Sequence, residues 1–153
     1  MSFGSSVLGA QAFGEVSNAA DTTAPTLSSA SGSSAAALSC QGSVTTDEGN
    51  GTLYTVFTAS STSPSAAQVK SGLDSAGSAA LRVVSQSVST SGPQTVASGA
   101  ISAGARFAHF MHEDAATNQS AVASSASFTV AAAANAFRRS GNSIGTRMGS
   151  RSL

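Results

Sequence analysis

The sequence predicts an all-β sandwich of about seven short strands with one short helix, and three observations support this prediction. Short runs of β-branched and apolar residues alternate with clusters of Ser, Gly, Thr and Asn, which is the pattern of strands and turns. Hydrophobic residues make up 41% of the 153 residues and charged residues only 9%, unlike the composition of most disordered chains. No apolar stretch approaches the roughly 20 residues that a membrane span needs, so we expect no membrane segment.

The stretch 101–130 is the most informative part of the chain. Residues 107–112 form a run rich in bulky apolar and aromatic side chains, and residues 113–120 form a polar cluster. In residues 121–130, small or apolar side chains alternate with Ser and Thr. Two strand-like runs joined by a turn predict a β-hairpin, which we expect to be the last hairpin of the sandwich.

The other strands are expected in chain order before this hairpin. They are predicted over residues 26–30, 36–44, 52–59, 81–88 and 94–100, with turns at 31–34, 45–51 and 89–92 and a loop at 73–77. In the second of these strands, Leu38 and Cys40 share a face by the period of two, and Gly42 continues it. In the third, Tyr54 and Val56 share one face, whereas Leu53 and Phe57 share the other. Alternation alone leaves open which of these two faces lies in the core.

A short helix is expected between the third and fourth strands. Ser63 is a suitable N-cap, Pro64 fits the first helical position, and Gly72 can end the last turn. The chain has one cysteine, Cys40, so an intrachain disulfide is excluded. We expect a buried, inert thiol with no nearby cation to lower its pKa.

Several stretches of this sequence resemble bacterial and phage fibronectin type III-like domains, which have an immunoglobulin-like sandwich. They are Asp-Thr-Thr-Ala-Pro-Thr at 21–26, Thr-Leu-Tyr-Thr-Val-Phe at 52–57, the helical stretch 64–72, residues 101–120 and Ser-Phe-Thr-Val at 127–130. The resemblance covers residues 21–130 and implies binding or display, not catalysis. Two positions depart from it: Phe107 stands where the family usually has a corner Tyr, and Thr117 where a turn usually has Gly.

Residues 1–20 are expected to form an extended N-terminal arm. Phe3, Leu8 and Phe13 each precede a glycine at intervals of five residues, which fits neither a helix nor a strand. Exposed apolar side chains of this kind usually mark a contact. We interpret the segment as an anchor laid on a partner or a neighbouring subunit; an unstructured leader and a first strand folded back on the domain remain alternatives.

Residues 131–153 are expected to form an Ala-rich connection, either a short helix or an extended exit, followed by a basic tail. The tail holds four arginines and no acid, and it repeats the apolar–Gly pairing of the N-terminal arm. Its candidate partner-binding residues are Arg138, Arg139, Ile144, Arg147, Met148 and Arg151. Such a tail favours an acidic surface or a phosphate, and a solvated tail is the alternative.

The residues that most resemble a chemical site are two histidines. Because His109 and His112 are three apart on a predicted strand, they face opposite sides and cannot share one zinc ion without a bulge. Asp114, Asn118 and the 47–50 loop offer calcium-type oxygen ligands, but turn capping is the favoured role. We find no nucleophile or phosphate-loop motif, and therefore expect no catalytic residue, no cofactor and no enzyme activity.

These features together predict a non-enzymatic virion structural protein of a tailed phage: a capsid decoration, or cement, protein on the outside of the shell. Its partners would be the major capsid protein and other virion proteins, contacted through both tails, with self-association also open. One alternative is a tail, neck or fibre component of the same virion. Another is a secreted carbohydrate-binding or adhesive module that binds a host-surface glycan, although the N-terminus does not resemble a signal peptide. Neither a membrane nor nucleic acid is an expected partner.

Overall fold

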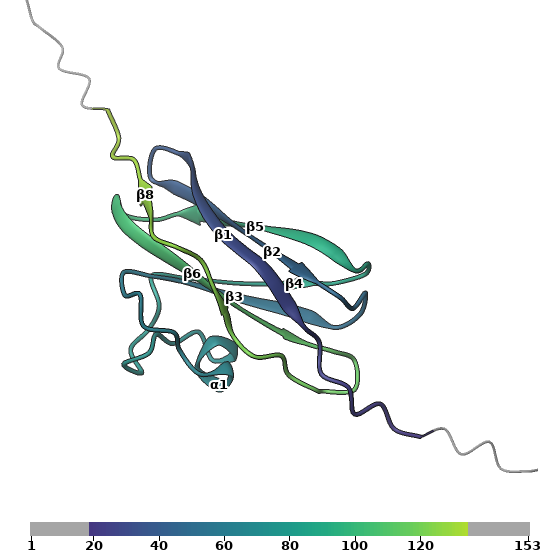
Figure 1. The fold of residues 1–153 in the computed structure, drawn as a ribbon. Coiled ribbons are helices and arrows are strands. Elements are labelled where there is room, and N and C mark those ends of the chain that lie inside the picture. Colours follow the sequence, from purple (N-terminus) through teal and green to yellow (C-terminus); the bar gives the residue numbers. More distant parts are fainter. Residues whose placement is uncertain (1–18, 135–153) are drawn as a thin grey trace, which may run out of the picture.

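The computed structural model describes residues 19–134, which form two antiparallel β-sheets packed face to face (Figure 1). The first sheet has the order β1-β2-β5, from strands Leu27–Ala36, Ser39–Thr46 and Gly92–Ala100. The second has the order β4-β3-β6, from strands Arg82–Ser87, Thr52–Thr58 and Gly104–Glu113. Two short strands, β7 (Ala123–Ser124) and β8 (Phe128–Val130), also pair with β6. The predicted all-β sandwich with one short helix is confirmed.

The main core lies between the two sheets. It contains fully buried side chains from both of them, among them Val44 of β2, Phe57 of β3 and Phe110 of β6. Leu53 and Phe57 therefore point toward the other sheet, which settles the question that alternation left open. The opposite face of β3, which carries Val56, is covered by the helix.

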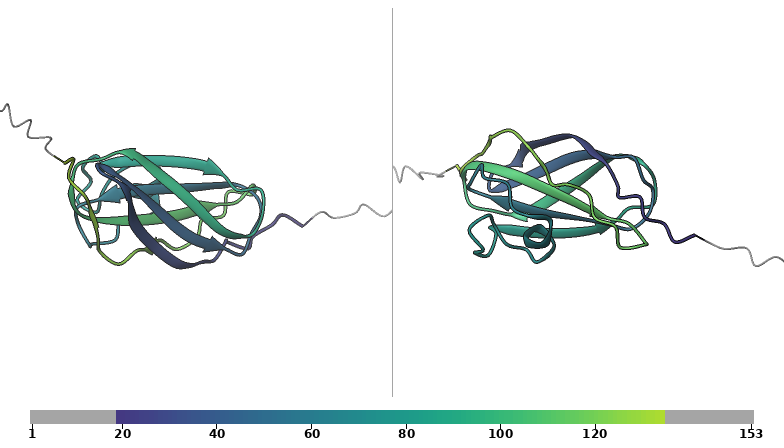
Figure 2. Two further views of the ribbon diagram at one scale, coloured as in Figure 1. Left: turned by 90° about the horizontal axis from the view of Figure 1, so that it is seen from above. Right: turned by 60° about the horizontal axis from the view of Figure 1, so that its bottom comes forward.

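Helix α1 (Ala66–Lys70) packs on the outer face of the second sheet, as the second view of Figure 2 shows. Its Val69 is buried against Val56 and Met111, which makes a smaller second core. The helix begins at Ser65: the Ser65 hydroxyl accepts from the Gln68 amide, and the Gln68 side chain accepts from the Ser65 amide. The predicted cap at Ser63 is thus wrong by two residues, because this reciprocal pair needs a Gln three positions on.

The turn predicted at 31–34 is wrong, because β1 continues through it. The chain reverses instead around Leu38, whose φ of 56° is left-handed and which is 39% exposed. Its predicted place in the strand 36–44, on the same face as Cys40, is therefore also wrong. Gly32 serves close packing: a Cβ there would lie 2.2 Å from the ring of Phe128. Cys40, which lies in β2, is fully buried as expected.

The last hairpin is present, but its second run is interrupted. Residues 121–130 were expected to form one strand, whereas β7 and β8 are separate short pieces. The Ser125 hydroxyl accepts from the Ala108 amide at 2.9 Å, in the place where a strand carbonyl would bond, and so replaces part of the ladder. The Ser120 hydroxyl does the same for the His112 amide at 2.9 Å. Residues 131–134 form neither helix nor strand.

Candidate functional site

The nine predicted partner-binding residues lie outside the part of the chain that the structure describes. These are Phe3, Leu8, Phe13, Arg138, Arg139, Ile144, Arg147, Met148 and Arg151. What the structure does define is where the segments that carry them join the sandwich.

The N-terminal segment joins at one end of the sandwich, which we call the N-terminal pole. Here the Asn118 side chain donates to the Asp21 carbonyl at 3.1 Å, and the Thr26 amide donates to the Asp47 carboxylate at 2.7 Å. Asn118 belongs to the turn after β6, and Asp47 to the turn after β2. These bonds fix residues 21–26 against the loops of this pole.

The C-terminal segment leaves from the other end, the C-terminal pole. The Leu38 amide donates to the Ala131 carbonyl at 2.9 Å, and Val130 pairs with Gly104 at the start of β6. The described chain therefore begins at one pole and ends at the other, as the views in Figures 1 and 2 show. A ten-residue strand at about 3.3 Å per residue separates the poles by roughly 30 Å.

Polar loops meet at the N-terminal pole, including two clusters that the sequence left apart. Asn50 accepts from the Ala115 amide at 2.9 Å, and Asp114 accepts from the Asn118 amide and side chain, both at 2.8 Å. These are capping bonds, as the sequence predicted. No group of three or more His, Cys, Asp or Glu within residues 19–134 is arranged to hold a metal ion.

The carboxylates of this pole have shifted pKa values with local causes. The hydrogen bond from the Thr26 backbone lowers the pKa of Asp47. Burial acts to raise the pKa of Asp114, but the bonds from Asn118 outweigh it and the pKa is lowered. Burial and the neighbouring carboxylates, Asp114 first among them, raise the pKa of Glu48. Asp47 and Asp114 are therefore charged groups that accept hydrogen bonds from backbone amides.

The two histidines lie on opposite faces of β6, as predicted, and both are fully buried. On the outer face, His109 Nε2 lies 3.0 Å from the Thr58 hydroxyl and Nδ1 lies 2.8 Å from the Ser124 hydroxyl. The Thr58 hydroxyl donates to the Ser60 carbonyl at 2.8 Å. Because that donation uses the only hydroxyl proton of Thr58, His109 Nε2 must donate to Thr58 and cannot act as its base.

His112 faces the main core and ties β6 to the neighbouring loops. Its Nδ1 lies 2.8 Å from the Thr46 hydroxyl, and its Nε2 lies 2.6 Å from the Asn50 carbonyl. Cys40 is equally enclosed: burial, the largest effect, raises the pKa of its thiol, opposed by Ser98 and by the charge of Arg106. The sequence had suggested no cation near this thiol, so Arg106 is a correction, although burial outweighs it. These side chains hold strands together.

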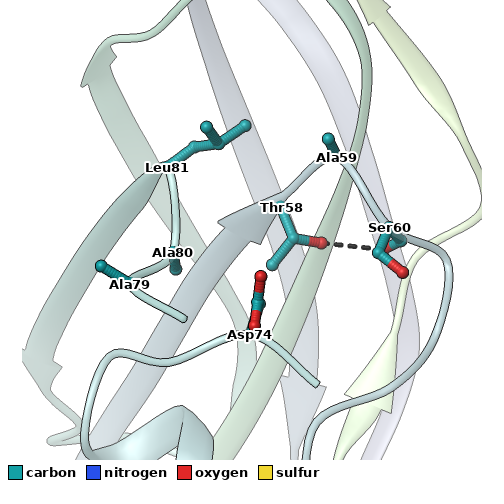
Figure 3. A pocket seen from close by; sticks show the side chains of 7 residues that line it. All are labelled: Thr58, Ala59, Ser60, Asp74, Ala79, Ala80 and Leu81. Carbon is teal, nitrogen blue, oxygen red and sulfur yellow. Dashed lines mark hydrogen bonds between the residues drawn. The ribbon is translucent and has the colours of Figure 1, made fainter. Parts of the chain in front are cut away.

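A small pocket near the C-terminal pole is a further feature that sequence reasoning missed. Its volume is about 280 Å³, and it lies between the end of β3 and the loop that leads into β4 (Figure 3). Thr58 and Ser60 line one side, Asp74 the floor, and Leu81 the rim. The sequence treated residues 73–77 as a plain loop, because nothing in its pattern signals that it folds back beneath Thr58.

Comparisons with known proteins give no match: no family model, no curated protein and no solved structure is similar to this chain. Among residues 19–134, no helix is long and apolar enough to cross a membrane.

Proposed function

We propose that this chain is a non-enzymatic structural protein of a tailed-phage virion, a capsid decoration protein that docks on the shell through its two terminal segments. One observation carries the proposal: segments of different chemistry join the sandwich at opposite poles. The segment 1–18 has three large apolar residues that each precede a glycine, and the segment 138–153 has four arginines and no acid. The family resemblance of the central domain to phage fibronectin type III-like modules agrees with this role.

The described body suits the role of a spacer. Its two buried histidines hold strands together: His109 joins β6 to β3 and β7, and His112 joins β6 to β2 and to the loop before β3. A body braced in this way keeps two attachment points about one strand length apart, roughly 30 Å. Attachment at two separated points can connect neighbouring subunits of a shell.

The mechanism we propose is multivalent. Each apolar side chain and each Arg–carboxylate pair contributes little alone, but linkage to one body turns the later contacts into intramolecular events. Arginine is suited to carboxylates on a protein surface because its planar fork makes paired hydrogen bonds. Avidity of this kind predicts that removing either terminal segment weakens attachment far more than removing one side chain.

The glycan-binding alternative receives less support from the described surface. The exposed large apolar side chains between residues 19 and 134 are Leu38, Leu81 and Val83, and none of them is aromatic. Carbohydrate sites usually offer aromatic rings to sugar faces, so binding of the intact protein to a glycan array would reopen this alternative.

The test is binding of the full chain to phage shells that lack it. We expect wild-type protein to cosediment with the shells, and a variant with Phe3, Leu8 and Phe13 all changed to Ser to lose most of its binding. A variant with all four C-terminal arginines changed to Gln should lose binding too, with stronger loss at high salt. Failure of the wild-type chain to bind any shell would overturn the proposal, and microscopy of labelled virions would show whether it sits on the tail instead.

A further inference from the structure

The pocket near the C-terminal pole combines a carboxylate with an apolar rim. Asp74 Oδ1 accepts from the amides of Ala76 and Ser78, both at 2.9 Å, and thereby holds the loop. Its second oxygen, Oδ2, takes no hydrogen bond from the described residues. Figure 3 shows this carboxylate on the pocket floor below Thr58.

Exposed apolar side chains lie at the rim of the pocket and beside it. Leu81 is 43% exposed and lines the pocket, and Val83, two residues on along β4, is 49% exposed. A side chain with a positive charge at its tip and an apolar stem complements both the carboxylate and the apolar rim. Arginine and lysine have this form, since their stems cover apolar surface while the charged head stays polar.

The three cations of the described body are already engaged. Lys70 pairs with Glu113 at 2.5 Å, and Arg82 donates to the Ala100 carbonyl. Arg106 donates to the carbonyls of Ser102, Ala103 and Ala105. The chain has seven Lys and Arg residues, so the remaining four are Arg138, Arg139, Arg147 and Arg151.

These four arginines follow the part of the chain that ends at the C-terminal pole. The C-terminal segment leaves beside Leu38, and the pocket lies at the same end, since Leu81 bonds to Phe57 and Arg82 to Ala100. Arg138 to Arg151 lie 4 to 17 residues beyond Ala134, which spans roughly 14 to 60 Å in extended chain. Crossing from β8 to β4 takes about 15 Å at 4.8 Å per strand, so the pocket is within reach.

We propose that this pocket holds an arginine side chain from the chain's own residues 138–153. The segment 1–18 is the poorer occupant, because it carries Glu15, has no Lys or Arg and joins the body at the far pole. A second copy is the poorer source, because a short tether gives the chain's own arginines a high effective concentration. One partly exposed ion pair is weak, so the arginine exchanges readily with carboxylates of a partner.

The test compares amide NMR spectra of full-length chains, so that no truncation is needed. We expect the amides of residues 74–81 to shift between wild type and the variant with all four C-terminal arginines changed to Gln. Asp74→Asn keeps the Oδ1 acceptor for the loop amides but removes the charge, and in this background the arginine changes should shift nothing. Changing the four arginines to Lys should preserve most of the wild-type shifts, and high salt should remove them.

Three results would overturn the proposal. The first is identical amide shifts at residues 74–81 in wild type and the Gln variant. The second is a difference that persists in the Asp74→Asn background, which would place the arginines elsewhere. The third is a difference that disappears on tenfold dilution, which would mean that a second copy supplies the arginine. Because this experiment uses the isolated chain, its outcome is independent of whether the protein binds a shell.

Discussion

The two poles of the sandwich differ in what their carboxylates and loops contact. At the N-terminal pole, Asp47 and Asp114 accept backbone amides, and Asn118 ties the incoming chain to the turn after β6. At the C-terminal pole, Leu81 is exposed and one oxygen of Asp74 has no bond from the described residues. We therefore expect substitutions at the N-terminal pole to cost more stability than substitutions near the C-terminal pole.

The largest effect is expected from Gly51→Ala at the N-terminal pole. Gly51 has a φ of 87°, and an added Cβ would lie 2.1 Å from the Glu113 carbonyl oxygen. Backbone strain of about 1–3 kcal/mol and overpacking of about 1–3 kcal/mol act together, so the variant should lose roughly 3 kcal/mol or more in the free energy of unfolding. Urea titration followed by circular dichroism measures this loss.

The matched control is Gly77→Ala near the C-terminal pole. Gly77 has a φ of 79°, but an added Cβ there meets nothing within 4 Å. Only the strain remains, at about 1–2 kcal/mol. Equal losses in the two alanine variants would contradict the claim that the N-terminal pole is the tightly braced one.

The second prediction concerns pH and His109, which lies beneath the loop that follows β3. Burial lowers the pKa of His109 in the folded protein, opposed by the Ser60 carbonyl. Below the unfolded pKa of about 6.5, the unfolded chain takes up a proton that the folded chain does not. Stability should therefore fall as pH drops from about 6.5, by up to about 1.4 kcal/mol per pH unit. Urea midpoints measured between neutral and mildly acidic pH would show the slope, and a flat profile would contradict it.

The third prediction is a gain in stability from Thr117→Gly at the N-terminal pole. Thr117 has a φ of 72°, which is unfavourable for a β-branched residue and natural for glycine. Relief of this strain should add about 1 kcal/mol, reduced by the greater entropy of glycine in the unfolded chain. Thr117→Ala keeps a Cβ and should gain little, so a comparable gain in the Ala variant would point to a cause other than backbone conformation.

The smallest effect is expected from Leu81→Ser on the exposed rim of the pocket. A half-exposed surface position usually changes the free energy of unfolding by no more than about 0.5 kcal/mol. Leu53→Ala in the main core, where the side chain is fully buried, should cost about 2–5 kcal/mol by contrast. A large loss from Leu81→Ser, measured by urea titration, would mean that the rim belongs to the core.

Sequence patterns predicted the strands better than they predicted the turns. The run 52–57 was recognisable because β-branched and aromatic residues alternate along it. Gly32 was predicted to lie in a turn, because glycine is common in turns. In the structure its lack of a side chain leaves room for the ring of Phe128, which is almost a hundred residues away in the chain. Leu38 was predicted to lie in a strand, although it is a turn residue. A left-handed turn residue other than glycine gives no local signal in the sequence.

The functional prediction was incomplete because it also depends on contacts between residues that are far apart in the chain. Charge and apolar spacing in the two tails are visible in the sequence, but the poles at which the tails join depend on long-range pairs such as Leu38 with Ala131. The pocket was missed because the fold brings together Thr58, at the end of β3, and Asp74, in the loop before β4. Pattern alone cannot place side chains that meet only through tertiary structure.

The most direct test of the central claim is shell binding by full-length chains in which only the tails are changed. We predict that a chain carrying both the three tail Ser substitutions and the four tail Gln substitutions retains the wild-type unfolding midpoint but no longer cosediments with shells. A chain with the exposed body residue Ser87 changed to Ala should bind as wild type does. Undiminished binding by the tail variant would contradict the account, because attachment would then belong to the sandwich itself.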